Sequence, residues 1–511
     1  MQTALLHRRS LLMKKEILLT DKYLRLPVIR DGEDCEVSFS VNGEKIWQFT
    51  IPVKTEEKGS CTGGYAQLPV EKWKGQMMTI ETDGELLPEE ILQSDETETR
   101  NQDVYPRLHF TPVSGWVNDP NGLCFYKGEY HLFFQHNMFD VKWNNMSWGH
   151  AVSRDLLHWT QLDEALFPDE DGTMFSGGAV VNFRGESLCP KDAMVLFYTC
   201  AGGSSRWSEG KEFTQKAAYS EDGRTVQKLP GVLIPHIARE NRDPKVGWLE
   251  EKGIYYMVLF LSGHEFAVFT SPDLREWKET QRLEIPESWE CPDLIRFSCG
   301  ENDRWVFWTA DGYYLVGSFD GEKFTPEQEV QRLYGNEVPY AAQTFWGTEK
   351  VIQIPWLRVL WDDKPYQGAM GIPRELELTR RDGVWLLEAH LPEELWKQRE
   401  RIYRDLPGAG QELEIPEGKS VVVTVENPEA RSFSLQLGAG SVAWEQEKGQ
   451  LTIEDETFAL PCAEELNVVL DRDLVEVSCN GDTVYFCKKM KAEADRKLVL
   501  CGEMTMEVGI L

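Results

Sequence analysis

A unit of short strands repeats imperfectly between residues 110 and 379, and this repeat constrains the fold of the 511-residue chain more than any other feature. Each copy contains an apolar, β-rich run, a turn, a second strand that ends in a small polar residue, and a strand with a Trp. The clearest copies combine residues 130–134 with 153–159 and residues 255–260 with 271–277. Self-similarity of short strands at a spacing of tens of residues is typical of a β-propeller.

Weaker copies begin near Met194 and Trp305, and together with a strand near residues 351–356 they predict about five blades. A propeller gathers the inner strands of its blades around one axial depression. Acidic residues that lie far apart in the sequence can therefore meet at one site.

Two further β-rich regions flank the repeats. Before Tyr105, residues 36–41 alternate between apolar and polar, and the polar stretch 94–103 is typical of a linker. After the loop at 407–410, strand-like segments recur with turn residues between them, as in a β-sandwich. We therefore predict an all-β protein with three parts: a small N-terminal β domain and linker over residues 1–104, a five-bladed β-propeller over 105–385, and a C-terminal β-sandwich over 386–511.

The charge of the chain limits its partners. With 85 acidic and 54 basic residues its formal net charge is −31. A polyanion would be repelled and no basic block offsets this charge, so we expect neither nucleic acid nor an anionic membrane surface as a partner. A neutral substrate fits better, and the 18 Trp suit sugar binding because a sugar ring can stack on an indole.

The N-terminal residues and the cysteines bear on the cellular location of the protein. Residues 1–15 lack the uninterrupted apolar run of a signal peptide, and no later stretch could span a bilayer. The 11 Cys are odd in number, scattered and without a Cys-x-x-Cys pair, which is typical of reduced thiols in a cytosolic enzyme. We predict a cytoplasmic protein with no cofactor and no metal. The N-terminal β domain could cap one edge of the pocket or mediate homo-oligomerisation.

Three acidic residues in turn-like contexts carry the best clue to function. Asp119 lies in Asn-Asp-Pro-Asn-Gly, Asp243 precedes a Pro, and Glu290 follows a Trp. Two carboxylates across a cleft are the minimum equipment for cleaving a glycosidic bond, one ionised to attack the sugar carbon and one protonated to release the leaving oxygen. Taken alone, Asp119 is better explained as a turn residue, because Asn-Asp-Pro-Asn-Gly has ideal turn chemistry.

Six motifs, in this order, resemble those of glycoside hydrolase family 32, the β-fructofuranosidases that include invertases, inulinases and levanases. The resemblance covers roughly residues 109–378 and, less strongly, the C-terminal β region. Its motifs lie at residues 116–122, 133–137, 148–151, 175–177, 242–244 and 290–293.

The resemblance implies that Asp119 is the nucleophile that forms a covalent fructosyl-enzyme intermediate, that Glu290 is the general acid/base and that Asp243 stabilises the transition state. Asp119 must then stay ionised and needs hydrogen-bond donors, whereas a desolvated or anionic neighbourhood would help Glu290 to hold its proton. Cys291 is expected to pack beside Glu290 and tune it. A retaining route predicts the two carboxyl groups about 5 Å apart.

The resemblance also implies a set of residues that bind the terminal fructose by hydrogen bonds, stacking and shape. Family members carry an acidic residue before a Tyr-Ala-Ala-Gln segment; this chain has Pro339 and an apparent extra residue there, so Glu337 is its counterpart. The expected set is Asn118, Gln135, Trp143, Phe175, Ser176, Arg242, Glu337 and Trp356.

We therefore expect a retaining hydrolase that releases terminal β-linked fructose from sucrose, fructo-oligosaccharides or fructans. Two alternatives stay open. A fructosyltransferase on the same scaffold would pass the fructosyl group to a sugar instead of water. A catalytically silent propeller would only bind sugar, although the presence of all three acids speaks against it.

Overall fold

The computed structural model describes residues 13–82, 91–100, 104–300, 302–426, 432–438, 440–461, 465–491, 497–502 and 504–511. Within these ranges the regular structure is almost entirely β, which confirms the all-β prediction. The single α-helix in the described part is α1 (Glu393–Gln398), and no helix there is long and apolar enough to cross a membrane.

The N-terminal part forms two antiparallel sheets that pack on one core. In β3 (Glu33–Val41) alternate side chains such as Val37 and Phe39 are buried, because successive residues of a strand point to opposite faces. The first sheet has the order β1 (Met13–Leu18), β6 (Met77–Thr82), β3 and β4 (Glu44–Val53). The second has the order β5 (Ser60–Pro69), β2 (Tyr23–Arg30) and β7 (Leu92–Ser94).

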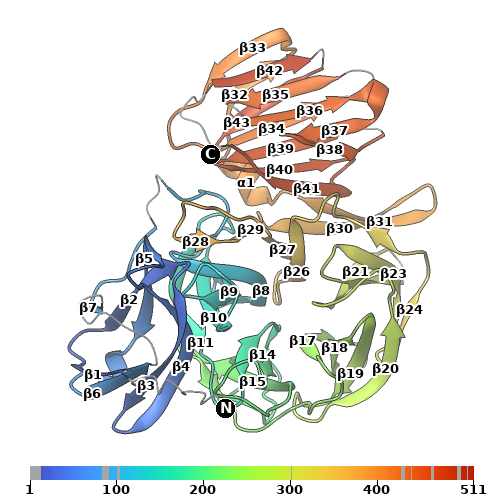
Figure 1. Cartoon of the computed structure of the whole chain (residues 1–511). Helices are drawn as coiled ribbons and strands as arrows, with labels where there is room; N and C mark the ends of the chain where they lie inside the picture. The colour runs from blue at the N-terminus through green and yellow to red at the C-terminus, as the bar shows by residue number, and fades with distance from the viewer. Residues whose placement is uncertain are drawn as a thin grey trace, which may run out of the picture.

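In the described part of the central region, five sheets follow one another along the chain, around a common centre in Figure 1. The first two contain β8 (Gly115–Tyr126), β9 (Glu129–Asn137), β10 (Ser147–Ser153) and β11 (Thr160–Leu166), and then β12 (Thr173–Phe175), β13 (Ala179–Val181), β14 (Met194–Ala201), β15 (Thr214–Ser220) and β16 (Gln227–Lys228). The third contains β17 (Arg242–Leu249), β18 (Ile254–Ser262), β19 (Glu265–Ser271) and β20 (Lys278–Glu284).

The fourth sheet contains β21 (Asp293–Cys299), β22 (Asn302–Trp308), β23 (Tyr313–Phe319), β24 (Phe324–Pro326) and β25 (Gln331–Arg332). The fifth contains β26 (Pro339–Thr344), β27 (Val351–Leu357), β29 (Ala369–Met370), β30 (Arg374–Arg381) and β31 (Val384–His390). Between β27 and β29 the chain returns to the first sheet, where β28 (Tyr366–Gln367) pairs in parallel with β8. This pairing ties the last sheet to the first, an arrangement consistent with a propeller.

The C-terminal part contains two six-stranded sheets that share one apolar core. The first has the order β32 (Glu400–Asp405), β43 (Met506–Ile510), β34 (Val421–Glu426), β39 (Glu465–Asp471), β40 (Leu474–Cys479) and β41 (Val484–Lys489). The second has the order β33 (Gly408–Glu414), β42 (Lys497–Gly502), β35 (Phe433–Leu437), β36 (Gly440–Glu445), β37 (Gln450–Ile453) and β38 (Glu456–Ala459).

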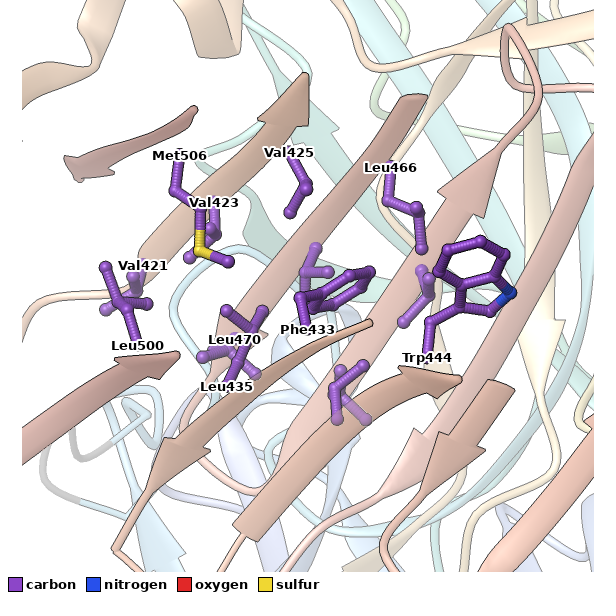
Figure 2. Close-up of a cluster of buried hydrophobic side chains, with 14 of the residues drawn as sticks. Val421, Val423, Val425, Phe433, Leu435, Trp444, Leu466, Leu470, Leu500 and Met506 are labelled. Carbon is purple, nitrogen blue, oxygen red and sulfur yellow. The ribbon is translucent and has the colours of Figure 1, made fainter. Parts of the chain in front are cut away.

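The two faces of β34 pack against different parts of the protein. Val421, Val423 and Val425 belong to the buried core drawn in Figure 2, together with Phe433 and Trp444 of the other sheet. The intervening Val422 faces the opposite way and packs with Leu108 and Leu395, which attaches the C-terminal part to the central region.

A buried charge network crosses the same junction. The His109 ring contacts Asp471 at 2.8 Å and Glu476 at 3.0 Å, and Arg374 also bonds to Glu476. Burial opposes a charge on His109, but the hydrogen bonds to the two carboxylates outweigh it and raise the pKa of His109 to about 9. The junction therefore contains paired, rather than isolated, buried charges.

Candidate active site

One cavity of about 410 Å³ opens near the common centre of the five sheets and collects most of the residues that the sequence predicts for the site. The three acidic residues Asp119, Asp243 and Glu290 all line it. Its other lining residues are Asn118, Gln135, Trp143, Met146, Phe175, Ser176, Phe213, Glu240, Arg242, Tyr340 and Trp356.

The cavity residues come from irregular places in the strands. β8, β17 and β26 each shift register where they reach the cavity, at residues 117–120, 242–245 and 340–343. Such bulges redirect side chains locally. Asp243, Glu290 and Cys291 also have positive φ angles of 65°, 57° and 41°, a left-handed conformation that is unfavourable for residues other than Gly. Strained backbone of this kind clusters at functional sites.

Asp119 is surrounded by hydrogen-bond donors. The Ser176 hydroxyl donates to its Oδ2 at 2.6 Å, and the Asn118 amide donates to its Oδ1 at 3.1 Å. The Trp116 indole in turn donates to the Asn118 oxygen at 2.8 Å and fixes the orientation of that amide. Burial raises the pKa of Asp119, and the Ser176 bond opposes this rise. The donors that the sequence analysis required are therefore present.

Asp243 is the most enclosed of the three acids, at 2% exposure. The Cys291 amide donates to its Oδ2 at 3.1 Å, and the Arg242 guanidinium lies 3.8 Å from the same oxygen. Burial is the largest influence and raises the pKa of Asp243 to about 7, against the lowering effect of Arg242.

Glu290 is held by a cation and a phenol. Arg242 Nη2 donates to Oε1 at 2.6 Å, and the Tyr340 hydroxyl donates to Oε2 at 2.8 Å. The Glu290 side chain is 27% exposed. The expected anionic neighbours are present, since Asp119 and Asp243 both interact electrostatically with Glu290. The adjoining Arg242 adds a positive charge beside the same carboxylate.

Cys291 also differs from its expected place. Its Sγ lies 3.6 Å from Asp119 Oδ2 and 3.6 Å from Asp243 Oδ2, so the thiol bridges these two acids instead of packing on Glu290. Burial raises the pKa of Cys291 well above its usual range. The group is therefore a protonated thiol that can donate a weak hydrogen bond to either carboxylate.

Aromatic rings form one wall of the cavity. Trp143 is 53% exposed and meets the Phe175 ring edge-on at 5.8 Å, and Phe175 meets Phe213 in the same way at 5.5 Å. The indole nitrogen of Trp356 is buried without a protein partner.

Glu337 is the one expected binding residue that the structure does not bring to the cavity. Its side chain is 70% exposed and pairs with Arg332 at 2.6 Å and Arg358 at 3.6 Å. β26 begins only at Pro339, and Tyr340 is the first residue of this segment that lines the cavity. The extra residue before Tyr340 leaves Glu337 outside, where the two arginines attract its carboxylate.

Four lining residues were absent from the expected set: Met146, Phe213, Glu240 and Tyr340. Glu240 lies two residues before Arg242 and accepts a hydrogen bond from it at 3.3 Å, and Tyr340 begins the Tyr-Ala-Ala-Gln segment. Because both residues lie beside a recognised motif, the sequence could have placed Glu240 and Tyr340 in the cavity. Met146 and Phe213 lie outside the strands, between β9 and β10 and before β15, where no periodic pattern marks them.

One group of side chains in the described part has the ligand types of a metal site. Within the described ranges, one group of side chains, Glu377, Glu388 and His390, has ligand atoms within 4.8 Å of one another. The His390 nitrogens already contact Asp482 at 2.9 Å and Glu388 at 3.2 Å. This group does not line the cavity and is explained by ion pairing.

Proteins of similar sequence include a levanase and a sucrose-6-phosphate hydrolase. The chain is 35% identical over 333 residues to a levanase of Bacillus subtilis, covering 57% of this chain and 48% of the levanase. It is 36% identical over 343 residues to a sucrose-6-phosphate hydrolase of Zymomonas mobilis, covering 58% of this chain and 64% of that protein. The match thus covers less than two thirds of the length of these relatives.

Solved structures show the same fold. The exo-inulinase of Aspergillus awamori superimposes with a TM-score of 0.71 at 24% identity, over 80% of this chain and 98% of that one. A glycoside hydrolase family 32 structure from Bifidobacterium adolescentis superimposes with a TM-score of 0.67 at 20% identity, over 97% of this chain and 98% of that one.

Residues 109–388, more than half of the chain, match the family described as Glycosyl hydrolases family 32 N-terminal domain. The matched range contains the cavity, all three acidic residues and the five sheets except the last two residues of β31. The chain belongs to glycoside hydrolase family 32.

Proposed function

We propose that the protein is a retaining glycoside hydrolase that releases terminal β-D-fructofuranosyl residues from sucrose, fructo-oligosaccharides or fructans. The observation that carries this proposal is the convergence of Asp119, Asp243 and Glu290 on one cavity, with donors arranged around Asp119. The names of the relatives support the same reaction class.

In the first step, Asp119 attacks the anomeric carbon of the fructosyl group while Glu290 gives its proton to the departing glycosidic oxygen. The bond to the leaving sugar breaks and an ester bond to Asp119 forms. In the second step, Glu290 takes a proton from water, which attacks the same carbon and releases fructose and free Asp119. Ser176 and Asn118 keep the attacking carboxylate oriented and ionised.

Arg242 donates to Glu290 Oε1 at 2.6 Å and orients the carboxylate that acts as the base in the second step. In the first step the hydrogen bond between Arg242 and Glu290 must break, because Glu290 then carries a proton. The Arg242 guanidinium can then donate hydrogen bonds to the sugar hydroxyls, which Asp243 also contacts. Hydrogen bonds from Asp243 to the sugar that tighten in the transition state would raise kcat.

The cavity favours a neutral sugar. Among its lining residues, all of which lie in the described part, Arg242 is the single cation, and it is already shared between Glu290 and Glu240. A phosphorylated sucrose would find no further positive charge there. We also propose a cytoplasmic location. Neither nucleic acid nor an anionic membrane is expected as a partner, because the net charge of −31 would repel both. The proposed reaction needs no cofactor, and homo-oligomerisation stays a prediction.

For the architecture, we propose that the five central sheets are the five blades of a propeller and that the two six-stranded sheets form a sandwich. Both sheets of the latter contribute to one buried cluster, which supports this assignment. An N-terminal domain ending at residue 104 agrees with the sheets of β1–β7. A boundary at residue 385 would cut β31, so we now place the division after His390.

Chromatography of the products after incubation with sucrose, short fructo-oligosaccharides, inulin and levan tests the function. Release of free fructose, absent with Asp119→Asn, is the expected result. Transfer to new oligosaccharides as the main outcome would make the protein a fructosyltransferase, and no turnover on any substrate would leave a sugar-binding propeller. Sucrose 6-phosphate, run in parallel, should react more slowly than sucrose.

A further inference from the structure

The segment 138–146, which connects β9 to β10, contacts both the cavity and the core of the N-terminal sheets. It brings Trp143 and Met146 to the wall of the cavity. Three of its other side chains, Met138, Phe139 and Val141, are at most 4% exposed and lie in the apolar core formed by β2–β6 of the N-terminal sheets. The segment leaves the central region, enters the N-terminal core and returns.

The contact at the start of the segment is apolar. The Phe139 ring lies 4.6 Å from the ring of Phe49 in β4. Asn137, the last residue of β9, accepts the Phe139 amide at 3.2 Å and donates to the Lys142 carbonyl at 2.9 Å. The chain between these residues is thus folded into a compact loop.

The contact at the end of the segment is polar and directional. The Asn145 side chain accepts the Thr50 amide at 2.9 Å and donates to the Thr50 carbonyl at 2.7 Å, as a neighbouring strand would. The same amide donates to Asn137 at 3.1 Å. Asn145 is 7% exposed and has a φ of +48°, which turns the chain so that Met146 and then β10 follow.

Trp143 lies between these two attachment points. Its indole is 53% exposed and touches the edge of Phe175, a contact that does not enclose it. Because few contacts fix the exposed Trp143 ring directly, its position depends on the conformation of the loop that carries it. Here the loop is held by β4 and its neighbours (Figure 1), which lie outside the family match that starts at residue 109.

We propose that the N-terminal sheets β1–β7 are a positioning element of the substrate-binding cavity, which acts through Asn145 and Phe139 to hold Trp143 against the sugar. This inference rests on the proposed function, since it assigns a role in the same site. The N-terminal domain would thereby position a residue of the cavity, although it contributes no catalytic acid itself.

The test compares Asn145→Ala with Trp143→Ala and the double variant, using sucrose and a short fructo-oligosaccharide. Loss of a well-placed aromatic contact should raise KM roughly three- to ten-fold in each single variant, with kcat within about two-fold. The double variant should resemble Trp143→Ala alone, because Asn145 acts through that ring. Asn145→Asp, which keeps the acceptor for the Thr50 amide, should lie between Asn145→Ala and the wild type.

Tyr23→Phe is the matched control. It removes another hydrogen bond between the N-terminal sheets and the first central sheet, from Tyr23 to Asp163 at 2.9 Å, which does not involve the segment 138–146. Its KM should equal that of the wild type. Equal effects of Tyr23→Phe and Asn145→Ala, or full additivity of Asn145→Ala with Trp143→Ala, would overturn the positioning role.

Failure of the proposed function gives a different result. If the wild type cleaves none of the sugars, hydrolysis is refuted, and calorimetric titration with fructose then decides the positioning role. Asn145→Ala should weaken that binding and Tyr23→Phe should not. A wild-type enzyme that is active while Asn145→Ala matches it in KM, kcat and fructose binding would refute the inference alone.

Discussion

The substitution Ser176→Ala tests how the cavity keeps Asp119 ionised. Burial raises the pKa of this carboxyl, and the Ser176 hydroxyl, which donates to Oδ2 at 2.6 Å, counteracts the rise. A hydrogen bond to a charged group contributes about 1.5–3 kcal/mol. Because one pKa unit corresponds to about 1.4 kcal/mol, its loss should raise the pKa of Asp119 by about one to two units.

The assay is kcat/KM for sucrose as a function of pH, which reports the groups that ionise in the free enzyme. A higher pKa leaves less of the nucleophile ionised at low pH, so the acidic limb of the profile should move up by about one to two units. The loss of activity should be largest at low pH and shrink as the pH rises. Ser153→Ala is the control, since this hydroxyl bonds to Asp155 at 3.1 Å and lies outside the cavity. An acidic limb that stays in place, or moves down, would refute the reasoning.

Three further predictions concern the junctions and the cavity wall. His109→Leu should lower the free energy of unfolding by about 3–5 kcal/mol in urea titrations, because it leaves Asp471 and Glu476 buried without their shared cation; an unchanged midpoint would contradict this. Burial raises the pKa of Asp140 to about 6, so the native state loses stability as the pH rises from about 4 to 6. Asp140→Asn should therefore be more stable than the wild type by about 1–3 kcal/mol at pH 7 and lose this advantage below about pH 4, which melting temperatures at both pH values will check. Trp356→Ala removes an indole that lines the cavity, so KM should rise roughly three- to ten-fold, and an unchanged KM would show that the substrate does not contact this ring.

Much of the fold and of the site could be predicted from the sequence, because both are recorded in short local patterns. The repeated strand units predicted an all-β chain, and the motifs around Asp119, Asp243 and Glu290 predicted side chains that share a cavity although they are up to 171 positions apart in the sequence. Trp143 and Trp356 lie outside these motifs, and the resemblance to the family placed them at the cavity.

The features that could not be predicted depend on contacts between distant segments. The hydrogen bond from Arg242 to Glu290 joins residues that are 48 positions apart. Glu290 also has a left-handed backbone conformation, which no propensity rule assigns to a Glu. Glu337 was misplaced because an insertion of one residue before Tyr340 changes which side chains reach the cavity. Phe139 showed no pattern of its own, because its partners are in strands that precede it by about 90 positions.

The account depends most directly on Asp119 as the nucleophile. Mass spectrometry of enzyme quenched in acid during turnover of sucrose, followed by peptide mapping, examines this point. We predict a covalent fructosyl group on the peptide that contains Asp119, enriched in Glu290→Gln and absent in Asp119→Asn. A fructosyl group on a different residue, or free fructose released by Asp119→Asn at a rate near that of the wild type, would contradict the mechanism.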